Sequence, residues 1–209
     1  MNFKIIFELD GTGICYDPTE PLHLDSLLAW ALLPMQYPNR KKLTRTNIPE
    51  EIQLPLLEKN VLGHEIWCAS ALFPEEAIET ITYIRKRLRH NKLYYTEGAF
   101  DTKGGPYRMH NIPLIKTLCR RMVAYASGNR KEVKRILKKH IKLLGKKRQG
   151  IVKDIHCEEI AENWSMVKEG KAMRWLPNEN GPRMVRLRPP YWNNTDRVLV
   201  AEIGADYQL

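Results

Sequence analysis

The sequence predicts an α+β fold of the ferredoxin-like or RRM-like type: an antiparallel sheet with helices on one face, plus insertions and a β-rich C-terminal extension. The main observation is the order of the patterned segments along the 209 residues, which is strand, helix, strand, strand, helix, strand. The second is the apolar fraction of 43%, which is enough for one ordinary core. We therefore expect a single domain over residues 1–209.

Four patterned segments lie in the first half of the chain. Residues 3–9 are β-rich and stop at a turn-forming Asp-Gly-Thr-Gly cluster, which is typical of a strand. Residues 23–33 carry apolar residues at helical spacing between two prolines, so we expect a helix that ends before Pro34. Residues 65–73 are strand-like, and 77–88 are predicted to be helical.

The second half begins with a Gly- and Pro-rich stretch at 97–113, which we expect to be a long loop. In residues 120–126 small or apolar side chains alternate with Arg121, Val123 and Tyr125, which predicts a strand with one face exposed to water. A strand is also expected at 151–160. Residues 161–209 mix turns with short β-like pieces and form the C-terminal extension.

A helix is expected between these two strands, capped by Asn129 or Ser127 and ending at Gly145. One stripe of it is apolar: Val133, Ile136, Leu137, Ile141 and Leu144. The rest is basic: Arg130, Lys131, Lys134, Arg135, Lys138, Lys139 and Lys142.

Positive charge is concentrated in this part of the chain. The formal net charge is +10, and residues 130–148 contain ten Lys or Arg and one acid, Glu132. Like charges at i,i+4 on a helix repel one another, so this pattern indicates an anionic partner, and binding to phosphates would be favoured by counterion release. The alternative is a basic helix that serves only solubility.

The loop after the helix has the sequence Gly-Lys-Lys-Arg-Gln-Gly. Its two glycines, Gly145 and Gly150, let backbone amides approach a phosphate, while Lys146, Lys147 and Arg148 supply charge. The loop lacks the Gly-Lys-Ser/Thr end of a Walker A motif, and it is no GxGxxG fingerprint after a strand, so both usual nucleotide loops are excluded.

The basic helix, the loop GKKRQGIVKDI and the strand after it resemble the glycine-rich loop of the RAMP superfamily of CRISPR RNA-binding proteins. The first strand followed by PLHLDSLLAWAL is similar to the opening of the Cas5-like subunit of type IV CRISPR effector complexes. The resemblance covers the two ends of the ferredoxin-like core. It does not extend clearly over residues 36–110.

This resemblance implies a subunit that binds crRNA, holds its 5′ handle and caps the effector complex for antiviral or anti-plasmid interference. Its partners would be crRNA, Cas7-like backbone subunits and the large subunit, with target DNA contacted only indirectly through guide pairing. Family proteins also use a thumb-like insertion, for which 36–62 is the candidate. The RNA-binding residues expected are Gly145, Lys146, Lys147, Arg148, Gln149, Gly150, Arg120, Arg121, Lys138, Lys139, Lys142, Arg40, Lys41, Lys42 and Arg45.

Two other functions are compatible with the sequence. Some Cas5-like relatives cleave precursor crRNA without metal, and the best catalytic candidates here are His110, Tyr107 and Lys103 in the Gly/Pro-rich stretch. In type IV systems a separate Cas6-like protein generally does the processing, so we expect a protein that is not an enzyme. A generic RNA-binding module outside CRISPR is the second alternative.

No cofactor or metal is expected, because the six histidines are scattered without ligand spacing and the four cysteines are far apart. The thiols are expected to be reduced and mostly buried. The chain begins without a signal-peptide pattern and has no apolar stretch long enough to span a bilayer, so we expect a cytoplasmic protein that does not bind membranes. Stacking of aromatics on bases is a further route to RNA, and the most exposed set expected is 189–192.

Overall fold

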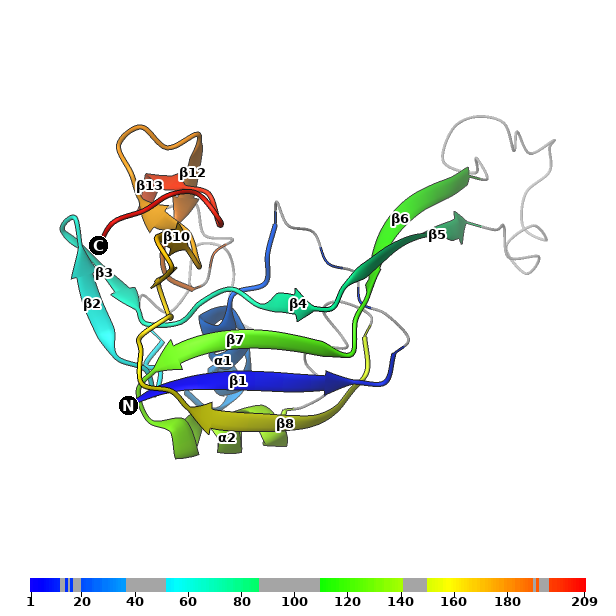
Figure 1. The fold of residues 1–209 in the computed structure, drawn as a ribbon, viewed down its shortest axis with the longest axis horizontal. Coiled ribbons are helices and arrows are strands. Elements are labelled where there is room, and N and C mark those ends of the chain that lie inside the picture. The colour runs from blue at the N-terminus through cyan, green and yellow to red at the C-terminus, as the bar shows by residue number, and fades with distance from the viewer. Residues whose placement is uncertain are drawn as a thin grey trace, which may run out of the picture.

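The computed structural model describes residues 1–11, 14, 16, 20–36, 52–86, 110–140, 150–189, 191 and 196–209. Its centre is a four-stranded sheet in the order β4-β7-β1-β8, with every neighbouring pair antiparallel. The strands are β1 (Asn2–Leu9), β4 (Phe73–Glu75), β7 (Arg121–Ser127) and β8 (Val152–Glu159). Helices α1 (Leu24–Gln36) and α2 (Arg130–Lys139) lie on one side of the sheet (Figure 1). The predicted antiparallel sheet with two helices is confirmed.

Alternation along β1 explains why the helices cover one face. Phe3, Ile5 and Phe7 point to the same side, and all three are buried in the main core with residues of α1, α2 and β7. Lys4 and Glu8 point to the other side, where they pair with Glu75 of β4 and Arg121 of β7. The helix-covered face is therefore apolar, and the opposite face is mixed.

Helix α2 begins as the sequence predicts. The side chain of Asn129 accepts a hydrogen bond of 3.2 Å from the backbone N–H of Glu132, so Asn129 rather than Ser127 is the N-cap. Val133, Ile136 and Leu137 are buried, as the apolar stripe requires. The predicted end at Gly145 is wrong, because the helix ends at Lys139 and His140 is its C-cap.

Helix α1 differs from its prediction at its C-terminal end. The helix continues through residue 34 to Gln36 instead of ending before the proline. A proline removes one backbone donor, and its ring crowds the carbonyl oxygen four residues earlier, so the last turn of α1 lacks one hydrogen bond. The buried leucines of the helix, Leu24, Leu27 and Leu28, hold it against the sheet.

The predicted helix at 77–88 is wrong, because this segment forms β5 (Ile78–Lys86). It pairs antiparallel with β6 (His110–Leu118), from Ile78 opposite Leu118 to Lys86 opposite His110. The segment is rich in β-branched residues, which favour a strand once a partner strand is available. Residues 110–113, expected in a loop, belong to β6, and the two strands form a ribbon that extends away from the central sheet (Figure 1).

Short strands complete the described fold. The predicted strand at 65–73 is split between β3 and β4, and the β-like pieces of the C-terminal extension are confirmed. These strands and their hairpin partners are β2 (Glu58–Val61), β3 (His64–Trp67), β9 (Val167–Lys168), β10 (Lys171–Ala172), β11 (Leu176–Pro177), β12 (Arg183–Arg186) and β13 (Arg197–Ala201). A second apolar cluster joins β2 and β3 to the extension, with Ile66, Leu176 and Val200 fully buried in it.

The extension also covers part of the sheet face opposite the helices. Tyr125 of β7 packs edge to face against Trp164, with ring centroids 5.3 Å apart, and residues 122–127 are buried on both sides of the strand. The expectation that one face of β7 is exposed to water is therefore wrong. Alternation in a single strand could not show that residues forty positions later would fold over it.

A buried arginine holds the extension to the core. The guanidinium of Arg174 donates hydrogen bonds to the backbone oxygens of Trp67, Ala69 (3.0 Å) and Leu187 (2.9 Å). It also donates to Asp25 Oδ2 at 3.1 Å, and the pair is almost completely buried. Tyr191 completes the network because its hydroxyl donates to the Asp25 carboxylate at 2.7–2.8 Å.

The described cysteines agree with the predicted reduced thiols. Cys68 and Cys119 are free and buried, and Cys157 is free and half-buried. Burial raises the pKa of the Cys157 thiol to about 11, so it stays protonated at neutral pH. Among the described helices, none is both long and apolar enough to cross a membrane.

Gly128, which connects β7 to α2, predicts a strong effect on stability. Its φ is +149°, and a Cβ placed there would lie 2.6 Å from the backbone oxygen of Pro55 and 2.7 Å from the Cα of Leu56. We expect Gly128→Ala to reduce the free energy of unfolding by about 2–4 kcal/mol, because strain and overlap with backbone add together. Chemical denaturation measures this, and equal stability of the variant would contradict the contact.

Gly63→Ala is the matched control. Gly63 also has a positive φ, +82°, but a Cβ there would meet nothing within 4 Å. Only the backbone strain remains, so the loss should be about 1 kcal/mol.

Candidate nucleic-acid interface

Several residues predicted to bind RNA meet at one end of the central sheet. There β1 ends and β7 and β8 begin: the N–H of Leu9 donates to the oxygen of Arg120 at 2.9 Å, and the N–H of Asp10 donates to the oxygen of Ile151 at 3.1 Å. Helix α2 also ends at this edge, because Lys138 Nζ lies 2.9 Å from Asp154 Oδ1 of β8. We call this region the basic end and define it by Arg120, Arg121, Lys138, Lys139 and Gly150.

Other predicted residues lie outside the described part of the chain. They are Arg40, Lys41, Lys42, Arg45, Lys142, Gly145, Lys146, Lys147, Arg148 and Gln149. The described end of the loop, Gly150, is buried beside the start of β8. The loop therefore returns to the sheet at the basic end, whatever path residues 141–149 take.

Some of the cations around the basic end already have carboxylate partners. Arg121 pairs with Glu8 at 3.0 Å, and Lys138 pairs with Asp154. On the side of α2, Arg135 pairs with Glu132 at 2.5 Å. The Arg135 and Lys138 partners hold the pKa values of Glu132 and Asp154 below their usual range. Within the described residues, these contacts compensate part of the predicted charge excess.

A second group of cations has no such partner. No described carboxylate forms an ion pair with Arg120, Lys131, Lys134 or Lys139, and three of these four side chains are exposed. Lys131 and Lys134 lie on α2, and Arg120 lies just before β7. These side chains can neutralise phosphates without first giving up a carboxylate.

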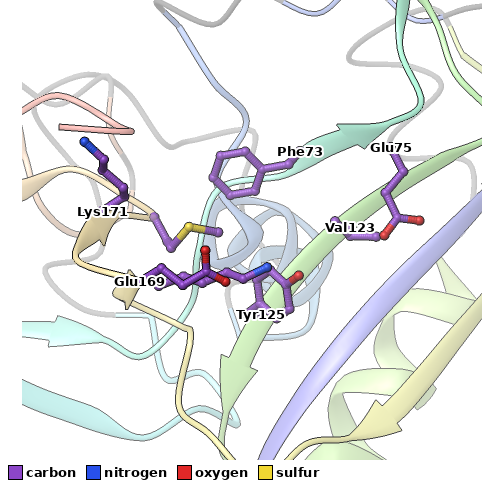
Figure 2. Close-up of a pocket in the computed structure, with 8 residues that line it drawn as sticks. Phe73, Glu75, Val123, Tyr125, Glu169 and Lys171 are labelled. Atoms are coloured by element: carbon purple, nitrogen blue, oxygen red, sulfur yellow. The ribbon is translucent and has the colours of Figure 1, made fainter. Parts of the chain in front are cut away.

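The sheet face opposite the helices is less suitable for a polyanion. A hollow of about 400 Å³ lies on this face, and its lining residues come from the sheet and from the β9–β10 hairpin. Figure 2 draws these residues as sticks. Its wall includes two carboxylates, Glu75 and Glu169, beside Lys168 and Lys171. Lys168 Nζ already lies over the Trp164 ring, 4.4 Å from its centroid. Covered aromatics and mixed charge disfavour stacking of RNA on this face.

The described residues give no geometric support for the alternative that the protein is an endoribonuclease. Tyr107 and Lys103 lie outside them, and His110 is described only as the first residue of β6. No group of three or more His, Cys, Asp or Glu in the described ranges is arranged to hold a metal ion. The absence of enzymatic activity remains a prediction.

Sequence reasoning missed a second site, at the start of α1. His23 is 2% exposed, and its ring packs at 4.5 Å from Trp175 and 5.1 Å from Tyr191, measured between centroids. These residues line a hollow of about 500 Å³ together with Arg183 and Arg197. The expectation that 189–192 is exposed is wrong for Pro189, which is buried, and for Tyr191, which is half-buried and donates its hydroxyl to Asp25. Residues 190 and 192 lie outside the described part.

His23 also makes stability depend on pH. Burial, and secondarily the charge of Arg174, hold the pKa of His23 well below its usual value of 6.5. The unfolded chain therefore takes up a proton below pH 6.5 that the folded protein does not, so stability is complete above that pH and falls as pH decreases. The slope from this residue should be at most about 1.4 kcal/mol per pH unit.

The measurement is denaturation of the protein and of a His23→Phe variant from pH 7.5 to 4.5. Phenylalanine keeps the ring packing but cannot titrate, so the variant should lose this part of the slope. Identical slopes would show that His23 titrates in the folded protein as it does in the unfolded chain.

A comparison with known families decides how the chain is classified. The family model described as CRISPR type IV associated protein Csf3 matches residues 1–203. The chain belongs to this family. It is therefore a type IV CRISPR-associated protein, and the type IV part of the sequence resemblance is confirmed. No curated protein matches the chain.

Proposed function

We propose that this member of the Csf3 family is a Cas5-like, RAMP-type subunit that binds crRNA in a type IV effector complex, holds its 5′ handle and caps the complex. The observation that carries the proposal is the gathering of Arg120, Lys138 and Lys139 with the returning loop at Gly150. Two described segments, the residue before β7 and the end of α2, bring positive charge to one edge of the sheet, and Gly150 lies at the same edge. A polynucleotide backbone is the ligand that such an edge fits best.

The topology supports the RAMP assignment. The sheet strands and helices follow the chain order β1, α1, β4, β7, α2, β8, and the spatial order is β4-β7-β1-β8. This order is the one expected of a βαββαβ ferredoxin-like unit, with the β5–β6 ribbon inserted between the second and third strands of the sheet. In this arrangement α2 and the loop after it lead directly into an edge strand, β8.

Exposed apolar side chains on the β5–β6 ribbon favour a contact with another subunit. Within the ribbon, Ile81 and Tyr83 are 63% and 56% exposed. Large apolar side chains exposed together on a projecting segment are typical of interaction surfaces. The predicted thumb-like insertion at 36–62 lies mostly outside the described residues, so the ribbon is a second segment that suits contact with a Cas7-like backbone subunit.

This contact predicts an assembly defect without a folding defect. Ile81 and Tyr83 lie on the same face of β5, so the double variant Ile81→Lys, Tyr83→Lys should lose co-purification with the partner subunits. Because both side chains are exposed, the free energy of unfolding should change by less than about 0.5 kcal/mol for each change. Thr80→Lys, on the opposite face, is the matched control, and normal assembly of the double variant would exclude this face.

Sequencing the RNA that co-purifies with the protein tests the function as a whole. A shared repeat-derived 5′ tag is expected for a subunit that holds the crRNA handle. A mixture of cellular RNAs without this tag would favour a generic RNA-binding module. Incubation of the pure protein with repeat RNA in EDTA tests the remaining alternative, because a specific cut would identify a metal-independent endoribonuclease.

A further inference from the structure

We infer that the hollow at the start of α1 binds one nucleotide, with the base against Trp175 and His23 and the phosphate beside Arg183 and Arg197. Its volume of about 500 Å³ lies within the range of roughly 300–1,000 Å³ that is usual for ligand sites. The wall combines aromatic and apolar surface with a few polar groups. The inference does not depend on RNA binding at the basic end, because the two sites share no residue.

His23 is the group that points to a ligand. Neither of its ring nitrogens has a hydrogen-bond partner within the described part of the chain, although both atoms are buried. An unsatisfied buried polar group costs folding free energy, so such groups in a native protein call for an explanation. A ligand that hydrogen-bonds the ring would remove this cost.

The protonation state of His23 fits a nucleobase. Because burial and Arg174 keep its pKa low, the ring is neutral near pH 7 and has one donor nitrogen and one acceptor nitrogen. The edges of nucleobases also present donors and acceptors side by side. A neutral imidazole can therefore bind such an edge, whereas a charged one would only donate.

The aromatic rings supply the second part of the site. Trp175 and Tyr191 meet edge to face with centroids 5.8 Å apart, and Trp175 is half-buried at the wall of the hollow. The guanidinium of Arg183 already lies over the Trp175 ring, 5.3 Å from its centroid. A base stacked on this face would take the place of the guanidinium and gain the same kind of contact with the ring, leaving Arg183 to contact the phosphate.

The charge at the rim supplies the third part. Arg183 and Arg197 line the hollow together with one carboxylate, Glu20. Arg183 contacts Glu20 at 3.4 Å, which is long for a charge-assisted hydrogen bond. Among the described side chains that line the hollow, two arginines face one carboxylate, and a guanidinium can hold a phosphate through two parallel hydrogen bonds. A planar aromatic group joined to an anion is the ligand class that satisfies all three parts.

The experiment titrates the full chain with each of the four ribonucleoside 5′-monophosphates and with single-stranded RNA. Tryptophan fluorescence reports occupancy, and ¹⁵N-detected spectra of the histidine rings report His23 directly. At least one monophosphate should saturate the protein and shift the His23 ring signals. His23→Phe should weaken the affinity for the monophosphate about tenfold, which corresponds to the loss of roughly one hydrogen bond.

Two double variants separate this site from the basic end. Arg183→Gln with Arg197→Gln changes only side chains at the rim, so it should fold normally and lose monophosphate binding at least tenfold. Arg120→Gln with Lys139→Gln removes the same charge from the basic end and should leave monophosphate binding unchanged while weakening RNA binding. If His23→Phe does not fold, the Arg183→Gln, Arg197→Gln variant still tests whether the hollow binds the monophosphate.

Competition identifies the source of the nucleotide. Displacement of the monophosphate by RNA means that the site takes a nucleotide of the RNA, and lack of displacement means that it takes a free nucleotide; both support the inference. Absence of saturable monophosphate binding, or equal affinity in the protein and its His23→Phe variant, would overturn it. If RNA binding persists in that case, the proposed crRNA function stands without this site.

Discussion

Replacing Lys146, Lys147 and Arg148 together by alanine is expected to weaken crRNA binding by up to roughly 50-fold at 0.15 M salt. Each phosphate contact to a single strand adds about 0.7 to the slope of log affinity against log salt, so three lost contacts should flatten the slope by about 2. The reason is that fewer counterions are released when fewer phosphates are neutralised. Filter binding or fluorescence anisotropy over a salt series measures both quantities.

The control variant removes three cations from the other end of the molecule. Lys59 lies on β2, Lys168 on β9 and Lys171 on β10. Figure 1 shows β2 and β10 away from the end of β1 where the basic end lies. Their replacement by alanine lowers the net charge by the same amount as the loop variant. Any loss of affinity in this control therefore measures only the long-range electrostatic attraction between the protein and RNA. Equal RNA binding by the loop variant and the unchanged protein, at low and moderate salt, would remove the loop from the site.

Replacing Asp25 by asparagine is expected to destabilise the protein by about 3–5 kcal/mol. The change leaves the buried Arg174 charge without its anion, although the guanidinium keeps its bonds to the oxygens of Ala69 and Leu187. It also removes an acceptor of the Tyr191 hydroxyl. Because Asp25 belongs to α1 and Arg174 to the extension, we expect the loss in a single cooperative transition measured by urea or heat.

An exposed pair is the matched control for this prediction. Lys171 lies 2.7 Å from Asp206, but both side chains are largely exposed. Asp206→Asn should therefore cost less than about 1 kcal/mol. In a further variant, Asp25→Leu with Arg174→Met should recover only part of the stability, because the backbone oxygens that Arg174 satisfies would remain unpaired. A cost for Asp25→Asn as small as that of Asp206→Asn would show that the buried pair does not tie the extension to the core.

Local patterns predicted the elements that depend on neighbouring residues. The segment from β7 through α2 to β8 follows from an alternating strand, a cap at Asn129 and an apolar stripe, and each of these is set by residues close in sequence. The segment at 78–86 was predicted wrongly because its charges and apolar spacing also suit a helix. Only its pairing with β6, more than twenty residues away, decides that it is a strand.

By itself the sequence determined the charge of this protein and where along the chain that charge is concentrated, because both depend only on composition and order. It also determined which face of α2 must be buried, since periodicity encodes it. Tertiary structure alone decided that Arg120 and Gly150 lie at one edge, and that His23 meets Trp175 and Tyr191 around one hollow. Such contacts join residues about 30 to 170 positions apart, and they arise from packing of whole elements, which no local pattern specifies.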